Sequence, residues 1–172
     1  MLSISKSANL RTQIGCMVKD VVLNIPDYCD LSWTKKRFVE NFADYGVSIK
    51  DTQLEGIGNR IKAGGTYTVK VWDVKCNVDM CDCIRFINVL NGEKIGSPLI
   101  PASYKGQFLL RELMPDIFPQ GLTYSPGYRQ DLWNYNGAAM VSAYDLDGDC
   151  HLLASYDECK MWQKCFITFQ KV

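Results

Sequence analysis

The clearest β-strand predicted from the sequence is Thr66–Lys75, where apolar and polar residues alternate and most are strong strand formers. One predicted face carries Tyr67, Val69 and Val71, and the other carries Thr68, Lys70 and Trp72. Alternation or β-branched runs predict further strands at Val18–Ile25, Ile84–Leu90, Glu93–Ile100, Ala138–Leu146, Cys150–Tyr156 and Met161–Gln170. The chain is therefore expected to be rich in strands.

Two dipeptides predict tight turns between successive strands. The residues of Asn91-Gly92 tolerate the positive φ of a type I′ turn, so we expect Ile84–Leu90 and Glu93–Ile100 to form a hairpin. Asp147-Gly148 predicts a second hairpin between the two strands on either side of it.

Apolar stripes and capping residues predict three helices. Ser32 is expected to cap the first, which ends before Gly46. The second begins with the capping box Thr52–Glu55 and ends at Gly64-Gly65, because glycine adopts the positive φ that often follows a helix. The third is expected to span Ser103–Met114, just before a proline.

Together these elements predict the fold class. Strands that follow one another through tight turns favour an α+β fold with an antiparallel sheet of roughly five or six strands built from hairpins. About three helices are expected to pack mainly on one face of the sheet. The length of 172 residues predicts a single globular domain, residues 1–172.

Composition and charge restrict the partners. The chain is 47% hydrophobic and 22% charged, which is typical of a globular protein and not of a disordered one. Its 19 basic and 19 acidic residues balance, so no overall positive field favours nucleic acid. No signal sequence or membrane span is evident, and eight irregularly spaced cysteines favour buried free thiols over a disulfide framework. We therefore expect a soluble cytoplasmic protein that does not bind membranes.

Three cysteines form a cluster that raises the question of a metal. Cys76, Cys81 and Cys83 can supply three zinc ligands, with His151, Cys150 or Cys159 as the fourth. Their spacing does not match the common zinc knuckle, and partly buried thiols at the start of a strand are the favoured interpretation. No cofactor is expected, and zinc remains the alternative.

Three carboxylates and one histidine are the other groups with chemical potential. Asp145, Asp147 and Asp149 resemble the opening of a calcium loop, but its later ligand positions are not matched, and a tight turn explains the segment. His151 is the chain's one histidine and lies in an apolar run, so a structural role is favoured over a catalytic pair with Cys83. We predict no catalytic residues, although a small enzyme built on either group remains an alternative.

The segment Phe118–Gly137 has no helical or strand period but is rich in aromatic residues. The predicted partner-binding residues are Tyr124, Tyr128, Arg129, Trp133 and Tyr135. Large rings and arginine are typical of recognition surfaces. An equally weighted alternative is that Trp133 caps the core and the tyrosines form its rim.

The sequence thus favours a small non-catalytic binding protein, of the inhibitor or adaptor type, that docks a protein partner through this aromatic segment. The first alternative is a zinc protein or small enzyme built on the Cys/His or Asp groups. The second is a nucleic-acid or carbohydrate binder that stacks its ligand on the same rings.

Overall fold

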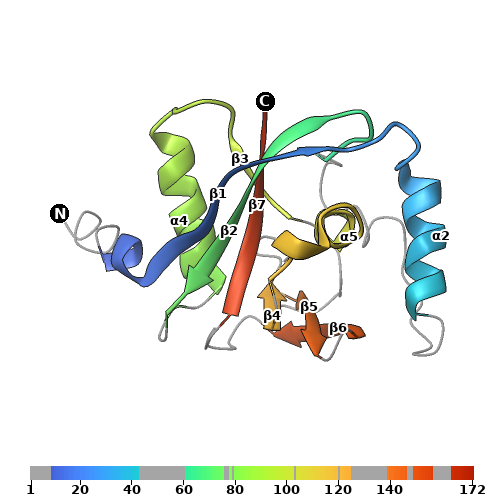
Figure 1. The fold of residues 1–172 in the computed structure, drawn as a ribbon. Coiled ribbons are helices and arrows are strands. Elements are labelled where there is room, and N and C mark those ends of the chain that lie inside the picture. The colour runs from blue at the N-terminus through green and yellow to red at the C-terminus, as the bar shows by residue number, and fades with distance from the viewer. Residues whose placement is uncertain are drawn as a thin grey trace.

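The computed structural model describes residues 9–42, 61–75, 78, 80–102, 104–119, 121–124, 139–146, 149–156 and 164–172. Its helices are α2 (Leu31–Phe42), α4 (Met80–Gly92), α5 (Tyr104–Leu113), a helical turn at residues 9–13 and the 3₁₀ turn η2 (Pro115–Ile117). Its strands are β1 (Ile14–Asn24), β2 (Thr66–Val74), β3 (Leu99–Pro101), β4 (Gly121–Tyr124), β5 (Ala139–Leu146), β6 (Asp149–Tyr156) and β7 (Lys164–Lys171). Figure 1 shows these elements in a mixed α+β arrangement, as predicted.

The C-terminal strand β7 lies in the middle of the sheet. The described strands follow the order β1-β2-β7-β4-β5-β6, and β3 also pairs with β7. One edge of β7 pairs with β2 along its whole length, whereas the other edge is shared by β4 at its first half and by β3 at its second. The sheet is mainly antiparallel, but β4 runs parallel to β7.

This topology corrects two details of the predicted sheet. Among the described residues, seven strands take part instead of the roughly five or six expected, and one of them, β4, lies in the segment Phe118–Gly137 that showed no strand period. The sheet is also not a series of hairpins, since α2 separates β1 from β2 in the chain and β7 enters between β2 and β4. Both differences arise because residues far apart in sequence form these pairs, which local patterns do not encode.

One face of the central strands packs against α5. Val69 and Val71 of β2 and Ile167 of β7 are at most 1% exposed and belong to one core cluster. The helix contributes Phe108, Leu109 and Leu110 to the same cluster.

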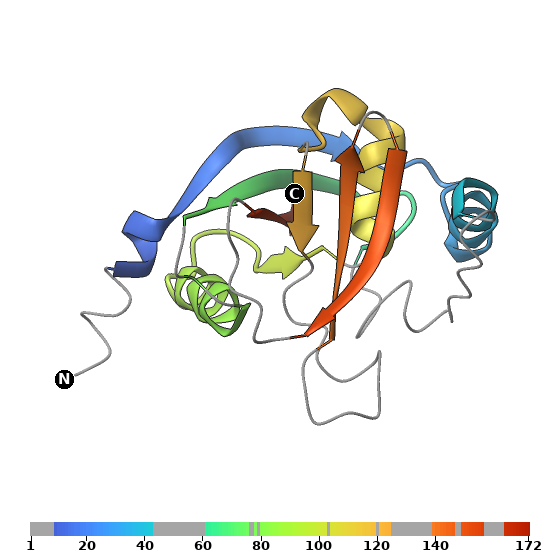
Figure 2. The same ribbon diagram turned by 90° about the horizontal axis from the view of Figure 1, so that it is seen from below.

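The opposite face of the same strands packs against α4. Trp72 of β2 lies opposite Phe166 of β7, and their rings are 6.1 Å apart and nearly parallel. Phe86 of α4 meets Trp72 edge-on, with ring centroids 5.1 Å apart. The two views of the fold place α4 and α5 on different sides of β7 (Figure 1 and Figure 2). The prediction that the helices pack mainly on one face is therefore wrong.

The predicted strand Ile84–Leu90 is part of the helix α4. Cys83, Phe86 and Ile87 are buried at a spacing of three and four residues, which puts them on one side of a helix. A short apolar run fits a strand or a buried helix equally well, and here the packing against Trp72 decides for the helix. The predicted hairpin at Asn91-Gly92 is wrong for the same reason, because these two residues end α4.

Other predicted elements are confirmed, with shifted ends. The strand expected at Val18–Ile25 is the longer β1, whose register shifts around Val18. The cap of α2 is Asp30 instead of Ser32, since the Asp30 carboxylate accepts a 2.8 Å hydrogen bond from the backbone N–H of Trp33. The predicted third helix corresponds to α5.

The C-terminal part of the prediction also holds. β5 and β6 are paired antiparallel as expected, with Leu146 opposite Asp149, and β7 is the predicted closing strand. Most of the predicted second helix lies outside the described residues, and its last expected residues, 61–63, are described and are not helical. Gly64, where it was expected to end, has a positive φ of +71°. None of the helices in the described ranges combines the length and apolar character needed to cross a membrane.

The core includes Cys165, whose thiol should make stability depend on pH. Burial raises the pKa of Cys165 from 9.0 to about 11, although its contact with the Thr123 hydroxyl lowers it. The unfolded chain releases this proton at a lower pH than the folded protein does, so stability held below pH 9.0 is lost as the pH rises toward about 11. Urea unfolding across this interval should show a decline in the free energy of unfolding that is shallower in Cys165→Ala. Equal slopes in both proteins would contradict the assignment.

Candidate functional site

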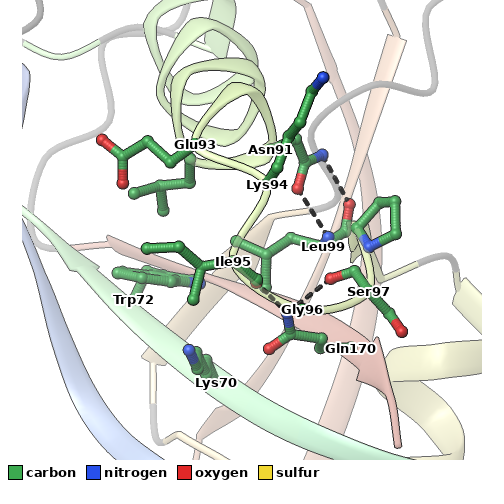
Figure 3. A pocket seen from close by; sticks show the side chains of 12 residues that line it. Lys70, Trp72, Asn91, Glu93, Lys94, Ile95, Gly96, Ser97, Leu99 and Gln170 are labelled. Atoms are coloured by element: carbon green, nitrogen blue, oxygen red, sulfur yellow. Dashed lines mark hydrogen bonds between the residues drawn. The ribbon is translucent and has the colours of Figure 1, made fainter.

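A pocket opens on the α4 side of the sheet, where α4 ends. Its cavity volume is about 290 Å³, and the segment between α4 and β3 forms one wall. The lining residues are Lys70, Trp72, Leu90, Asn91, Glu93, Lys94, Ile95, Gly96, Ser97, Pro98, Leu99 and Gln170. Figure 3 shows the connecting segment arching over side chains that stand on β2 and β7.

Strand register explains why β2 and β7 both contribute to this pocket. Thr68 lies opposite Gln170, and Lys70 lies opposite Thr168. Side chains directly across an antiparallel pair share a face, so Lys70, Trp72 and Gln170 all project on the α4 side. α4 covers the part of this face around Trp72 and ends there. The part around Lys70 is covered instead by the segment that connects α4 to β3.

Asn91 fixes the exit of the chain from α4. Its side-chain carbonyl accepts a 2.7 Å hydrogen bond from the Leu99 N–H, and its amide donates to the Leu99 carbonyl at 3.1 Å. The Asn91 side chain thereby makes the two hydrogen bonds that a neighbouring strand would make with Leu99 at the start of β3. These bonds hold the two ends of the segment between Asn91 and Leu99 together as a loop. We call residues 93–98 the pocket loop.

Gln170, on β7, holds the pocket loop against the sheet by hydrogen bonds. Its amide nitrogen donates to the backbone carbonyls of Ile95 and Ser97, at 3.2 Å and 2.5 Å. Two carbonyl partners require the amide nitrogen to face the loop, which leaves the side-chain oxygen as an acceptor on the pocket side (Figure 3). Gly96, between the two carbonyls, has a φ of +74°, and a Cβ there would come within 3.1 Å of the Gln170 nitrogen. Close packing and the left-handed backbone both favour glycine.

The floor of the pocket is apolar. Trp72 is 8% exposed, and its indole N–H donates a 2.8 Å hydrogen bond to the buried Thr168 hydroxyl. Since the only polar atom of the indole is satisfied inside the core, Trp72 offers the pocket only its ring. Ile95 of the pocket loop is 78% exposed and lies near this ring in Figure 3.

The charges around the pocket leave a positive balance. Glu93 forms an ion pair with Arg11, which precedes β1. Lys70 makes no hydrogen bond or ion pair with the part of the chain that the structure describes. In Figure 3 it lies beside Gln170 at the open side, whereas the Lys94 side chain extends away from it.

Sequence reasoning did not identify this pocket. The sequence indicates only a turn residue at Asn91 and the end of a strand at Gln170. The one local indication of the pocket is that Lys70 and Trp72 lie on the same face of a predicted strand. That pattern gives no information about the loop that covers these residues. The pocket depends on β7 pairing with β2, a contact of more than 90 residues in sequence separation.

The predicted partner-binding residues fall mostly outside the described residues. The backbone of Tyr124 ends β4, where it pairs with Ser142 of β5 and with Phe166 of β7. Tyr128, Arg129, Trp133 and Tyr135 lie outside the described ranges. Their role stays a prediction.

The predicted metal ligands are dispersed over different elements. Cys83 is a buried residue of α4 itself, and His151 belongs to β6, which β4 and β5 separate from β7. Cys76 and Asp147 lie outside the described residues, and of Cys81, Asp145 and Asp149 only the backbone is described. Within the described ranges, no three His, Cys, Asp or Glu side chains gather as a metal site would require. The zinc and acidic sites stay predictions.

Four cysteines can be placed. Cys29, Cys83 and Cys165 are buried and Cys16 is partly buried, and none of the four forms a disulfide. Burial raises the pKa of the Cys16 and Cys29 thiols as well as that of Cys165. Cys16, Cys29 and Cys165 therefore lack the lowered pKa that marks a reactive cysteine.

Comparisons with known proteins leave the family open. No protein-family model, no curated protein and no solved structure matches the chain.

Proposed function

We propose that the protein is a small non-catalytic binding protein that docks a protein partner through the aromatic segment Phe118–Gly137. The observation that carries the proposal is that part of this segment forms β4, and that the residues after β4 connect it to β5, the strand with which β4 pairs. β4 ends at Tyr124 and β5 begins at Ala139, and the register pairs Tyr124 with Ser142. The register thus brings the end of β4 and the start of β5 close together in the sheet.

The start of the segment is anchored in the core. Phe118 is 7% exposed and packs in the cluster that contains α5. Thr123 is fully buried, with its hydroxyl 3.5 Å from the Cys165 sulfur on β7. Anchored ends lower the entropy lost when an intervening segment binds, which favours affinity.

The chemistry of the segment supports a protein partner. Tyrosine, tryptophan and arginine dominate the binding energy of protein interfaces because they bury large areas and make directional hydrogen bonds. The balanced charge of the whole chain gives no comparable support to a nucleic-acid partner.

The test is affinity purification from the native host with quantitative mass spectrometry. We expect the double variant Arg129→Ala/Trp133→Ala to lose at least about 90% of partner recovery, since two central interface residues cost about 2 kcal/mol or more each. A matched control is Tyr28→Ala/Arg85→Ala, which removes one arginine and one aromatic residue that are exposed elsewhere on the protein.

Thermal unfolding of the same variants separates binding from packing. Loss of the partner with an unchanged unfolding midpoint supports the proposal. Full partner recovery by Arg129→Ala/Trp133→Ala contradicts it, and a lowered midpoint with retained recovery favours the alternative in which Trp133 caps the core. Recovery of nucleic acid that disappears with added salt would favour the nucleic-acid alternative.

A further inference from the structure

We propose that the pocket beneath the pocket loop binds a small organic carboxylate with an apolar body, independently of the aromatic segment. The carboxylate meets Lys70, and the apolar body lies between Trp72 and Ile95. The proposal rests on the form, the charges and the hydrogen bonding of the pocket.

The form of the pocket suits a small molecule. Its volume of about 290 Å³ is at the lower end of ligand pockets, which argues for a fragment-sized ligand and against a peptide. Trp72 and the buried Leu99 provide fixed apolar walls. Gln170 holds the pocket loop through two hydrogen bonds, and Asn91 ties the two ends of the loop together through two more to Leu99, so the walls are largely formed before a ligand arrives.

The charges favour an anion. Arg11 engages the one carboxylate among the lining residues, Glu93, which leaves the lysines uncompensated. Lys70 is partly buried on β2 and stands at the pocket's open side (Figure 3). A carboxylate there gains a charge-assisted hydrogen bond in a partly desolvated position, where such a bond is stronger than at a fully exposed surface.

Gln170 adds a second requirement. Both of its N–H groups face carbonyls of the pocket loop, so its oxygen is an acceptor toward the pocket. A ligand that carries a hydroxyl in addition to its carboxylate satisfies this acceptor. A hydroxylated aromatic acid therefore matches the acceptor, the cation and the apolar floor together.

The experiment is an NMR titration with three probes that share one body and differ in charge. The probes are 4-hydroxyphenylacetate, its neutral amide 4-hydroxyphenylacetamide, and the cation tyramine. We expect saturable shifts of the Gly96 and Ser97 amides and of the Trp72 indole N–H, with the carboxylate binding about tenfold more tightly than the amide and tyramine more weakly still.

A pair of variants tests the role of Lys70. Lys70→Gln should weaken the carboxylate about tenfold and leave the amide unchanged, because it removes the charge at nearly constant length. Lys171→Gln is the matched control, since Lys171 lies opposite Tyr67 and so on the other face of the sheet. The ¹⁵N spectrum of each variant checks that the fold is retained.

Four results would overturn the proposal. The first is that 4-hydroxyphenylacetate causes no saturable change in the NMR chemical shifts of the pocket residues. The second is equal affinity for the carboxylate and the amide. The third is equal weakening by Lys70→Gln and Lys171→Gln, which would indicate only an effect of net charge. The fourth is shifts confined to residues outside the pocket.

Discussion

Replacing Phe166 by alanine is expected to lower the free energy of unfolding by about 3–5 kcal/mol, the cost of emptying a fully buried aromatic site. Phe166 is 0% exposed and stacks on Trp72 under α4. A sheet with helices on one face only would leave this position in solvent, where the same change costs little. Chemical denaturation of the variant therefore measures whether both faces of β7 are cores.

The control for this change is another aromatic residue at the surface. Tyr28 is 61% exposed and contacts Trp33 edge-on at 5.6 Å. Tyr28→Ala should lower the free energy of unfolding by no more than about 1.5 kcal/mol, the contribution of one contact between aromatic rings. Similar losses in the two variants would contradict the burial of Phe166 beneath α4.

Replacing Thr168 by valine is expected to destabilise the protein by about 1–3 kcal/mol although the side-chain volume hardly changes. The Thr168 hydroxyl accepts the hydrogen bond of the Trp72 indole N–H, and both groups are buried. Valine leaves that N–H without a partner in the core, which costs its desolvation free energy. Urea unfolding of wild type and variant measures the loss.

A double-mutant cycle identifies the hydrogen bond as the cause. In a Trp72→Phe background the N–H is absent, so Thr168→Val should cost less than about 1 kcal/mol there. If the cost of Thr168→Val is the same in both backgrounds, the hydrogen bond is not its origin, and the indole contributes through packing alone.

The aromatic segment and the pocket place the two proposed binding activities on different parts of the chain. The segment contains β4 and the connection from β4 to β5, whereas the pocket is built from β2, β7, the end of α4 and the pocket loop. Variants that abolish one activity should therefore leave the other intact, and the two experiments can fail separately.

Local sequence patterns were sufficient to predict those elements for which one pattern fits only one kind of structure. β2 was predicted from strict alternation of strong strand formers, and α5 from its apolar stripe and the proline after it. The pairing of β5 with β6 followed from the short connection between them. In each case the local pattern fits only one kind of element, so it predicts the element even where, as for β2, the partner strands lie far away in the sequence.

The tertiary structure alone decided the features that depend on distant contacts. Ile84–Leu90 is helical because Phe86 packs on Trp72, and β7 lies at the centre because it pairs with β2 almost a hundred residues earlier. The pocket requires both, since Lys70 and Gln170 come together only through that pairing. Local periodicity indicates which side of an element is apolar, but not which other element packs against that side. The pocket exists because α4 and the pocket loop cover this face of β2 and β7.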